Sequence, residues 1–258
     1  MPSFREGSRL FGNTPRPQRL NQSLSLSISS FSGRPEVWNK GPDIEVKPER
    51  PTFIRNFRES RGPIYLALHG ETEWNQQRRF QGRLDSPLTE KGLNQSRRAG
   101  VTLRRLVGNS AEFHIVTSPL GRARETARLI CSTLNVDFAR VEIDSRLAEI
   151  DLGSWAGLTR EEVEKHWADL VPGAGRYDWY FRSPDGERFE DLANRLGAFL
   201  ASAKDRNGVT IAVTHGVASR VLRGVYAGLP REKAITLENN RNVLFRLCDG
   251  FVDSVPYD

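Results

Sequence analysis

Two histidines, His69 and His215, occupy matching positions in the sequence. Each follows a short, mostly apolar run, residues 64–68 and 209–214, and each directly precedes a glycine that allows a sharp turn and close approach to a ligand. Such runs are typical of buried parallel strands. Because ligands bind outside the carboxyl ends of strands in open α/β sheets, we expect neighbouring strands that bring the two imidazoles together. The pattern predicts a two-histidine site at one sheet edge.

A repeating order of strands and helices starts near Gly62 and predicts the scaffold that positions these histidines. The predicted strands are 64–68, 113–117, 141–143, 209–214 and 243–248. The predicted helices are 89–106, with Thr89 as N-cap, then 121–134, 159–170, 187–204 and 217–227. Alternation of this kind indicates an α/β fold with a mainly parallel sheet and helices on both faces.

Residues 1–60 have a different composition and are expected to form a disordered tail rather than a domain. They hold seven of the 14 prolines and a Ser-rich run at 23–30, and no helical period is sustained. Residues 1–61 also carry 11 Lys or Arg against 6 Asp or Glu, so most of the net charge of +6 lies there. We therefore expect residues 61–258 to form the functional domain. The basic tail alone gives little support for a nucleic acid partner.

Composition limits the protein classes and the cellular compartment that are expected. No stretch approaches the roughly 20 apolar residues of a membrane span, so no membrane association is expected. The two cysteines, Cys131 and Cys248, give no disulfide framework, which fits a reducing compartment and a cytoplasmic location. No spacing of His, Cys and Asp resembles a metal-ligand set. The oligomeric state is not predicted.

Six motifs resemble those of one known family in order and spacing. They occupy residues 69–75, 80–92, 118–127, 147–155, 184–187 and 214–216, within a resemblance that covers about 62–247. The sequence resembles the histidine phosphatase, or phosphoglycerate-mutase-like, superfamily. The resemblance implies a three-layer phosphoglycerate-mutase-like fold and a metal-independent phosphomonoesterase without a cofactor. Such an enzyme acts on a small phosphorylated substrate through a phosphohistidine.

The resemblance also implies a role for each site residue. His69 is the nucleophile, which must be a neutral imidazole aimed in line at phosphorus. Arg122 and His215 bind the phosphoryl oxygens, and Arg122 begins a helix whose first amides favour anions. Glu149 is the general acid, which afterwards activates water. The implied substrate-binding residues are Thr72, Asn75, Gln81, Gly82 and Gly216.

One position departs from the family pattern. The residue before the nucleophile is Leu68, where the family has an arginine that binds phosphate. Losing one such cation costs on the order of 10²–10³ in rate, so we expect impaired activity unless a nearby arginine substitutes. The candidates considered are Arg78, Arg83 and Arg220.

Two other functions stay open: an inactive phosphate-binding protein, and a phosphoglycerate mutase. The mutase is disfavoured because the family's cofactor-dependent mutases carry inserted segments that this domain lacks. Specificity is expected from the aromatic-rich segment 157–185, either by covering the crevice or by simple packing.

Overall fold

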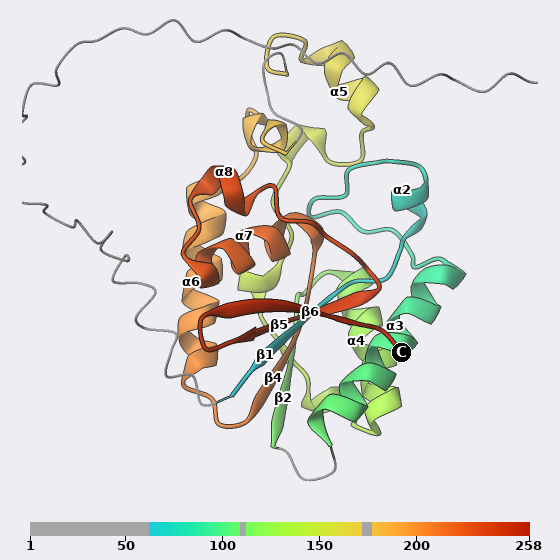
Figure 1. The fold of residues 1–258 in the computed structure, drawn as a ribbon. Coiled ribbons are helices and arrows are strands. Elements are labelled where there is room, and N and C mark those ends of the chain that lie inside the picture. Colours follow the sequence, from blue (N-terminus) through green and yellow to red (C-terminus); the bar gives the residue numbers. More distant parts are fainter. Residues whose placement is uncertain (1–61, 109–111, 172–176) are drawn as a thin grey trace, which may run out of the picture. The chain divides into compact units, whose positions relative to one another are not determined.

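A computed structural model describes residues 62–108, 112–171 and 177–258. The predicted tail, residues 1–60, lies outside the described residues. The described residues form a sheet with helices on both of its faces (Figure 1). Within these ranges no helix is long and apolar enough to cross a membrane.

The sheet is of mixed type, and its parallel part carries four of the five predicted strands. The strands are β1 (Ile64–Leu68), β2 (Phe113–Thr117), β3 (Glu142–Ile143), β4 (Val209–Thr214), β5 (Val243–Cys248) and β6 (Phe251–Pro256). Their order is β3-β2-β4-β1-β5-β6. Strands β1 to β4 pair in parallel, whereas β5 pairs antiparallel with β1 and with β6. The prediction of a mainly parallel sheet is confirmed.

Strand β6 was missed by the sequence analysis, in which 243–248 was the final strand. Asp249 and Gly250 join β5 to β6, with φ angles of 52° and 83°. Two residues with positive φ form the tight turn that suits the twist of a hairpin, and Asp-Gly is a favoured pair for it. That dipeptide was the available signal for β6.

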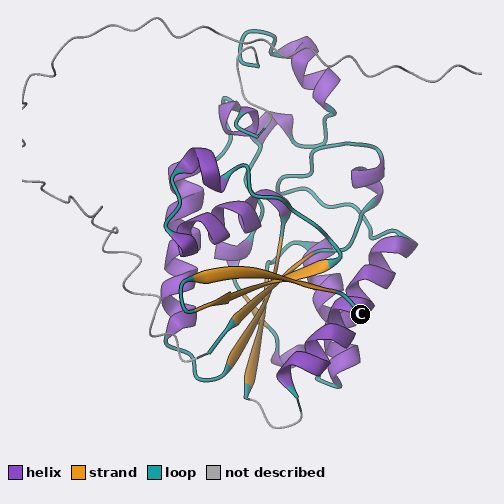
Figure 2. Cartoon of the chain, in the orientation of Figure 1, coloured by secondary structure: helices purple, strands orange, loops and turns teal. Residues whose placement is uncertain are grey.

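Two pairs of helices cover the sheet (Figure 2). Helices α3 (Glu90–Val107) and α4 (Gly121–Leu134) pack on one face, and α6 (Phe189–Lys204) and α7 (Gly216–Ala227) on the other. The shorter helices are α2 (Glu73–Gln76), α5 (Arg160–His166) and α8 (Arg231–Ala234). Helix α5 begins at a Thr159–Glu162 capping box and ends four residues before the predicted boundary at Leu170.

Strand β1 takes part in both hydrophobic cores. Ile64, Leu66 and Leu68 pack in the core on the α6 and α7 side. Tyr65 and Ala67 pack in the core on the α3 and α4 side. Successive side chains of a strand point to opposite faces, so a fully buried strand must be apolar throughout. Leu68, 4% exposed, is thus packed in the core directly before the first histidine.

The aromatic residues of segment 157–185 mainly serve packing. Trp179 stacks on Trp155 with ring centroids 5.5 Å apart, and both rings are buried. Phe181 is also buried in this cluster. Residues 172–176 of the segment lie outside the described residues. The packing interpretation therefore holds for most of these aromatic side chains, with Tyr180 as the exception described below.

Gly70 meets a steric requirement different from the expected turn. Its φ is not among the positive values, and a Cβ atom built on it would collide with the carbonyl group of Gly92. Gly92 lies in the first turn of α3, which Thr89 caps as predicted by accepting a hydrogen bond from the Gly92 amide. The glycine after His69 thus lets the loop lie directly against α3.

Substituting Gly70 should therefore destabilise the fold. We expect Gly70→Ala to lower the free energy of unfolding by about 1–3 kcal/mol, because backbone must move to accept the methyl group. Denaturant unfolding of both proteins measures the difference. Gly250→Asn is a matched control, since that position has open space and a left-handed conformation that asparagine tolerates. Equal stability of Gly70→Ala and the parent would contradict the steric explanation.

Candidate active site

The two motif histidines lie side by side at the carboxyl edge of the sheet. Strands β1 and β4 pair in parallel with Leu68 opposite Thr214, and the His69 amide donates to the Thr214 carbonyl at 3.0 Å. The two imidazole centroids are 5.2 Å apart. The predicted placement of His69 and His215 on neighbouring strands is confirmed.

His69 has the protonation pattern that a nucleophile requires. Its Nδ1 lies 2.7 Å from the carbonyl oxygen of Gly70, which can only accept, so Nδ1 carries the hydrogen and Nε2 is left unprotonated. Burial lowers the pKa of His69 well below its usual value, and the charges of Arg122 and Arg241 lower it further. The imidazole is therefore neutral, with the lone pair of Nε2 available.

His215 lies beside His69 in a fully buried position. Its Nε2 is 2.7 Å from the hydroxyl of Ser118, the residue that follows β2. Its Nδ1 is buried and has no hydrogen-bond partner among the described residues. Burial, followed by the charge of Arg122, lowers the pKa of His215 well below its usual value. The ring is thus a neutral group beside His69, and one of its nitrogens has no partner among the described residues.

A cavity of about 330 Å³ opens beside His69. Seven of the predicted site residues line it: His69, Asn75, Gln81, Gly82, Arg122, Glu149 and Gly216. Thr72 and His215 do not. Thr72 instead caps α2 by accepting from the Asn75 amide, and it also accepts from the Gln81 side chain at 2.8 Å. Its role is therefore to hold the loop that presents Asn75 and Gln81.

Arg122 is almost fully buried at the start of α4, and most of its donors are engaged. It donates to the carbonyls of Leu84 at 2.6 Å and Gly82 at 2.9 Å, and it pairs with Asp85 at 2.8 Å. Its Nε is buried without a partner in the described structure. Asp85 also accepts from the first amides of α4, at Gly121 and Arg122. The anion expected at this helix start is thus a protein carboxylate.

Glu149 is held at the start of α7. Its carboxylate accepts hydrogen bonds from the amides of Val217 at 3.1 Å, Ala218 at 2.9 Å and Ile150 at 3.0 Å. Arg195 fixes the backbone below it by donating to the carbonyls of Glu149 and Ala148. The carboxylate therefore has a fixed position on the wall of the cavity that also holds His69.

The arginines around the cavity only partly match the three that the sequence offered as substitutes for the missing cation. Arg78 and Arg83 do not line it, whereas Arg220 does. Arg220 donates to the Leu237 carbonyl at 2.7 Å and stacks over Tyr177. Arg79 and Arg241 also line the cavity and were missed, because neither belongs to a recognised motif. Asn239 is a further lining residue that was not predicted, whereas Tyr180 belongs to the segment 157–185 that was expected to cover the crevice.

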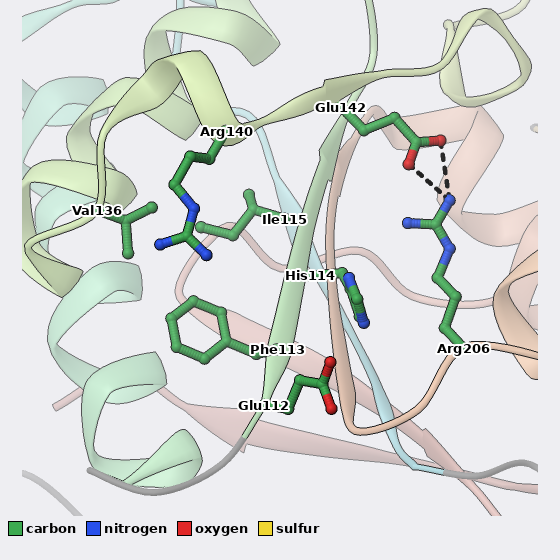
Figure 3. A pocket seen from close by; sticks show the side chains of 8 residues that line it. All are labelled: Glu112, Phe113, His114, Ile115, Val136, Arg140, Glu142 and Arg206. Atoms are coloured by element: carbon green, nitrogen blue, oxygen red, sulfur yellow. Dashed lines mark hydrogen bonds and ion pairs between the residues drawn. The ribbon is translucent and has the colours of Figure 1, made fainter.

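A second hollow, of about 270 Å³, lies beside the amino-terminal half of β2 (Figure 3). Its Glu142 and Arg206 form an ion pair at 2.7 Å, and His114 Nε2 is 3.0 Å from the carbonyl of Asn207. Phe113 and Ile115 lie on the other side of the strand from His114 (Figure 3). This hollow contains neither motif histidine and has no arrangement comparable to the His69 site.

Comparison with known proteins assigns the chain to a family. The model of the histidine phosphatase superfamily (branch 1) matches residues 64–247. The chain belongs to this superfamily, and it has the superfamily's phosphoglycerate-mutase-like fold.

Similar proteins and structures carry the names of a mutase and of a phosphatase. A probable phosphoglycerate mutase, GpmB, of Citrobacter koseri is 38% identical over 183 residues, which cover 68% of this chain and 80% of the relative. The structure of YhfR from Bacillus stearothermophilus is 30% identical, with a TM-score of 0.58 over 76% of this chain and 96% of that one. A mycobacterial glucosyl-3-phosphoglycerate phosphatase, solved with VO3, shares the fold at 24% identity and a TM-score of 0.57, covering 76% and 98%.

Burial of the two neutral histidines predicts a specific pH dependence of stability. Their pKa values are lowered in the folded state, so below pH about 6.5 the unfolded chain binds more protons. Stability is therefore full above that pH and is lost as the pH falls, by up to about 1.4 kcal/mol per unit for each histidine. We expect His69→Gln to reduce the slope of stability against pH by the equivalent of about one bound proton, in phosphate-free buffer. Identical slopes for the parent and the variant, measured by denaturant unfolding from pH 8 to 5, would contradict the assignment.

Proposed function

We propose that the protein is a metal-independent phosphomonoesterase that acts on a small phosphorylated substrate through a phosphohistidine at His69. The observation that supports this most directly is the His69 imidazole. Its Nδ1 hydrogen is fixed by the Gly70 carbonyl, and the ring lines a cavity shared with Arg122 and Glu149. A neutral nucleophile, a cation and a carboxylate in one cavity are the groups that phosphoryl transfer through a protein nucleophile requires.

The proposed reaction has two steps. Nε2 of His69 attacks phosphorus, the bond to the ester oxygen breaks, and the Glu149 carboxyl gives its proton to the leaving alkoxide. Water then attacks the phosphohistidine, Glu149 takes a proton from it, and the bond from phosphorus to nitrogen breaks. Inorganic phosphate leaves, and His69 and Glu149 return to their starting forms. Positive charge on Arg122 stabilises the phosphoryl oxygens in both steps.

The residue Leu68 bears on how active the proposed enzyme is. Leu68 borders the cavity at the position where the family pattern has an arginine, and its apolar side chain cannot bind phosphate, so phosphate must be bound by cations from other positions. The expectation of impaired activity stays a prediction, as does the alternative of an inactive phosphate-binding protein. Turnover of p-nitrophenyl phosphate distinguishes these two, because an inactive protein binds phosphate without hydrolysing the ester.

Phosphoglycerate mutase is the second candidate, since relatives such as the Citrobacter koseri protein carry that name. The same phosphohistidine would serve it, with the phosphoryl group returned to a second hydroxyl instead of water. Isomerisation of phosphoglycerate in the presence of a bisphosphate primer, at a rate above hydrolysis, would favour the mutase. We prefer the phosphatase because the domain lacks the inserted segments of the cofactor-dependent mutases.

Removal of the nucleophile gives the first activity prediction. We expect His69→Ala to reduce kcat/KM for p-nitrophenyl phosphate by at least roughly 10³, since the remaining groups have no nucleophile to activate. His166→Ala is the matched control, because its ring lies on α5 outside the cavity. Comparable turnover by His69→Ala and the parent would reject the proposed function.

The role of Glu149 predicts a dependence on the leaving group. We expect Glu149→Gln to lower kcat/KM for an alkyl phosphate by roughly 10²–10⁴, because an alkoxide needs the proton. The loss for p-nitrophenyl phosphate should be under about tenfold, since nitrophenolate leaves unprotonated. The value of kcat/KM reports formation of the phosphohistidine, so later steps do not obscure the comparison. Equal losses for both substrates would show that Glu149 is not the acid.

A further inference from the structure

Arg241 enters the cavity from the side of β1 opposite to His215. Strand β5 runs antiparallel to β1, with Leu66 opposite Phe245. The residues just before β5 therefore lie at the end of β1 that carries Leu68 and His69. The sheet order β4-β1-β5 thus places His69 between His215, at the end of β4, and the segment that contains Arg241.

The segment that carries Arg241 is fixed by buried polar contacts. Arg223, 4% exposed on α7, donates to the Glu238 carbonyl at 2.9 Å and to the Asn239 side chain at 2.8 Å. Asn239 in turn donates to the carbonyl of Gly216 at 2.7 Å. These bonds tie the segment to the start of α7, whose amides hold Glu149. Arg241 is therefore presented from a preorganised support.

The guanidinium of Arg241 has an unused donor, as that of Arg122 does, whereas Arg79 and Arg220 each donate to protein groups. Arg79 is occupied by Glu162 and the Gly157 carbonyl, and Arg220 by the Leu237 carbonyl. The Nε of Arg241 is buried and has no hydrogen-bond partner among the described residues. Buried donors are normally satisfied, so an unpartnered one on a cavity wall indicates a ligand that accepts its hydrogen bond.

The electrostatics of the site agree with this geometry. The charge of Arg241 is one of the causes that lower the pKa of His69, after burial and the charge of Arg122. Burial lowers the pKa of Arg241, and the carboxylates of Glu71 and Glu149 oppose this shift by favouring its charged form. Its positive charge thus acts on the nucleophile itself, at a place where an incoming phosphoryl group would add the compensating negative charge.

We propose that Arg241 is a catalytic residue that binds the phosphoryl oxygens and supplies the positive charge missing at Leu68. The inference rests on the proposed phosphatase function of the same site. Leu68 and Arg241 lie at the same end of the β1–β5 pair, so a guanidinium from the segment before β5 replaces one from the strand. The core position is then free to be apolar. Arg241 stays protonated throughout and exchanges no bonds or protons.

The test compares Arg241→Ala and Arg241→Lys with the parent. We expect Arg241→Ala to lower kcat/KM for p-nitrophenyl phosphate by roughly 10²–10³, the effect of one transition-state cation. Arg241→Lys should recover part of the loss, because it keeps the charge without the planar pair of donors. Arg246→Ala, on β5 with an exposed side chain, is the matched control and should keep the parental activity.

Melting temperatures separate binding of phosphate from a structural role. Without phosphate, Arg241→Ala should be at least as stable as the parent, because a buried unpartnered donor is removed. Inorganic phosphate should raise the melting temperature of the parent and have a much smaller effect on Arg241→Ala. A variant that is less stable in phosphate-free buffer, yet gains as much from phosphate as the parent does, would overturn the inference.

The outcomes also distinguish this inference from the proposed function. If the parent is active and depends on His69, but Arg241→Ala keeps activity within about threefold, the inference is wrong and the phosphatase stands. If the parent is inactive, the phosphatase is wrong and calorimetric titration with inorganic phosphate decides about Arg241. At least tenfold weaker binding by Arg241→Ala supports the inference, and equal binding overturns it. No phosphate binding by the parent overturns both.

Discussion

The parallel pairing of β1 with β4 is the constraint on which the site depends. The hydrogen bond from the His69 amide to the Thr214 carbonyl continues the ladder past the end of β1 and sets the register of the two histidines. A slip by one residue would turn every side chain of β1 to the opposite face of the sheet, and it would displace both Leu68 and His69. Because both strands are buried and apolar, that register is strongly specified. The position of His69 is therefore a consequence of how the two cores are filled.

Two carboxylates that accept hydrogen bonds from the first amides of helices influence the charge in the cavity. Asp85 takes the first amides of α4, and Glu149 takes those of α7. These carboxylates occupy amides at both helix starts, whose polarity would otherwise favour the phosphoryl group. The positive charge that faces a substrate must therefore come from arginine side chains. This is the physical reason to expect that Leu68 lowers activity and that the arginines around the cavity compensate for it.

Much of the scaffold could be predicted from the sequence. Apolar runs ending in His-Gly identified β1 and β4, and the capping residue Thr89 identified the start of α3. The strand β6 was missed although Asp249-Gly250 carried a turn signal. Helix α5 was predicted too long, since a polar helical pattern does not show where tertiary packing stops supporting it.

The site was less predictable than the scaffold, for physical reasons. Motifs marked His69, Arg122 and Glu149, whose local sequence is constrained by the elements that hold them. Arg241 lies in the segment Asn239-Asn240-Arg241-Asn242, which has no periodicity, and only the sheet order brings it to His69. Thr72 was assigned to the substrate but caps α2, because a capping threonine and a ligand-binding threonine look the same in sequence. Contacts between side chains that are far apart in the sequence can be identified only once the fold is known.

The measurement that tests the account most directly is detection of the covalent intermediate. Glu149→Gln, which should slow attack by water, is mixed with an aryl phosphate and quenched in alkali, where phosphohistidine is stable. Intact mass and peptide mapping then locate the adduct. The account predicts one phosphoryl group per chain, on His69, that is lost on acidification and absent from His69→Ala. An active enzyme that forms no adduct, or that carries an acid-stable phosphoryl group on another residue, would contradict it.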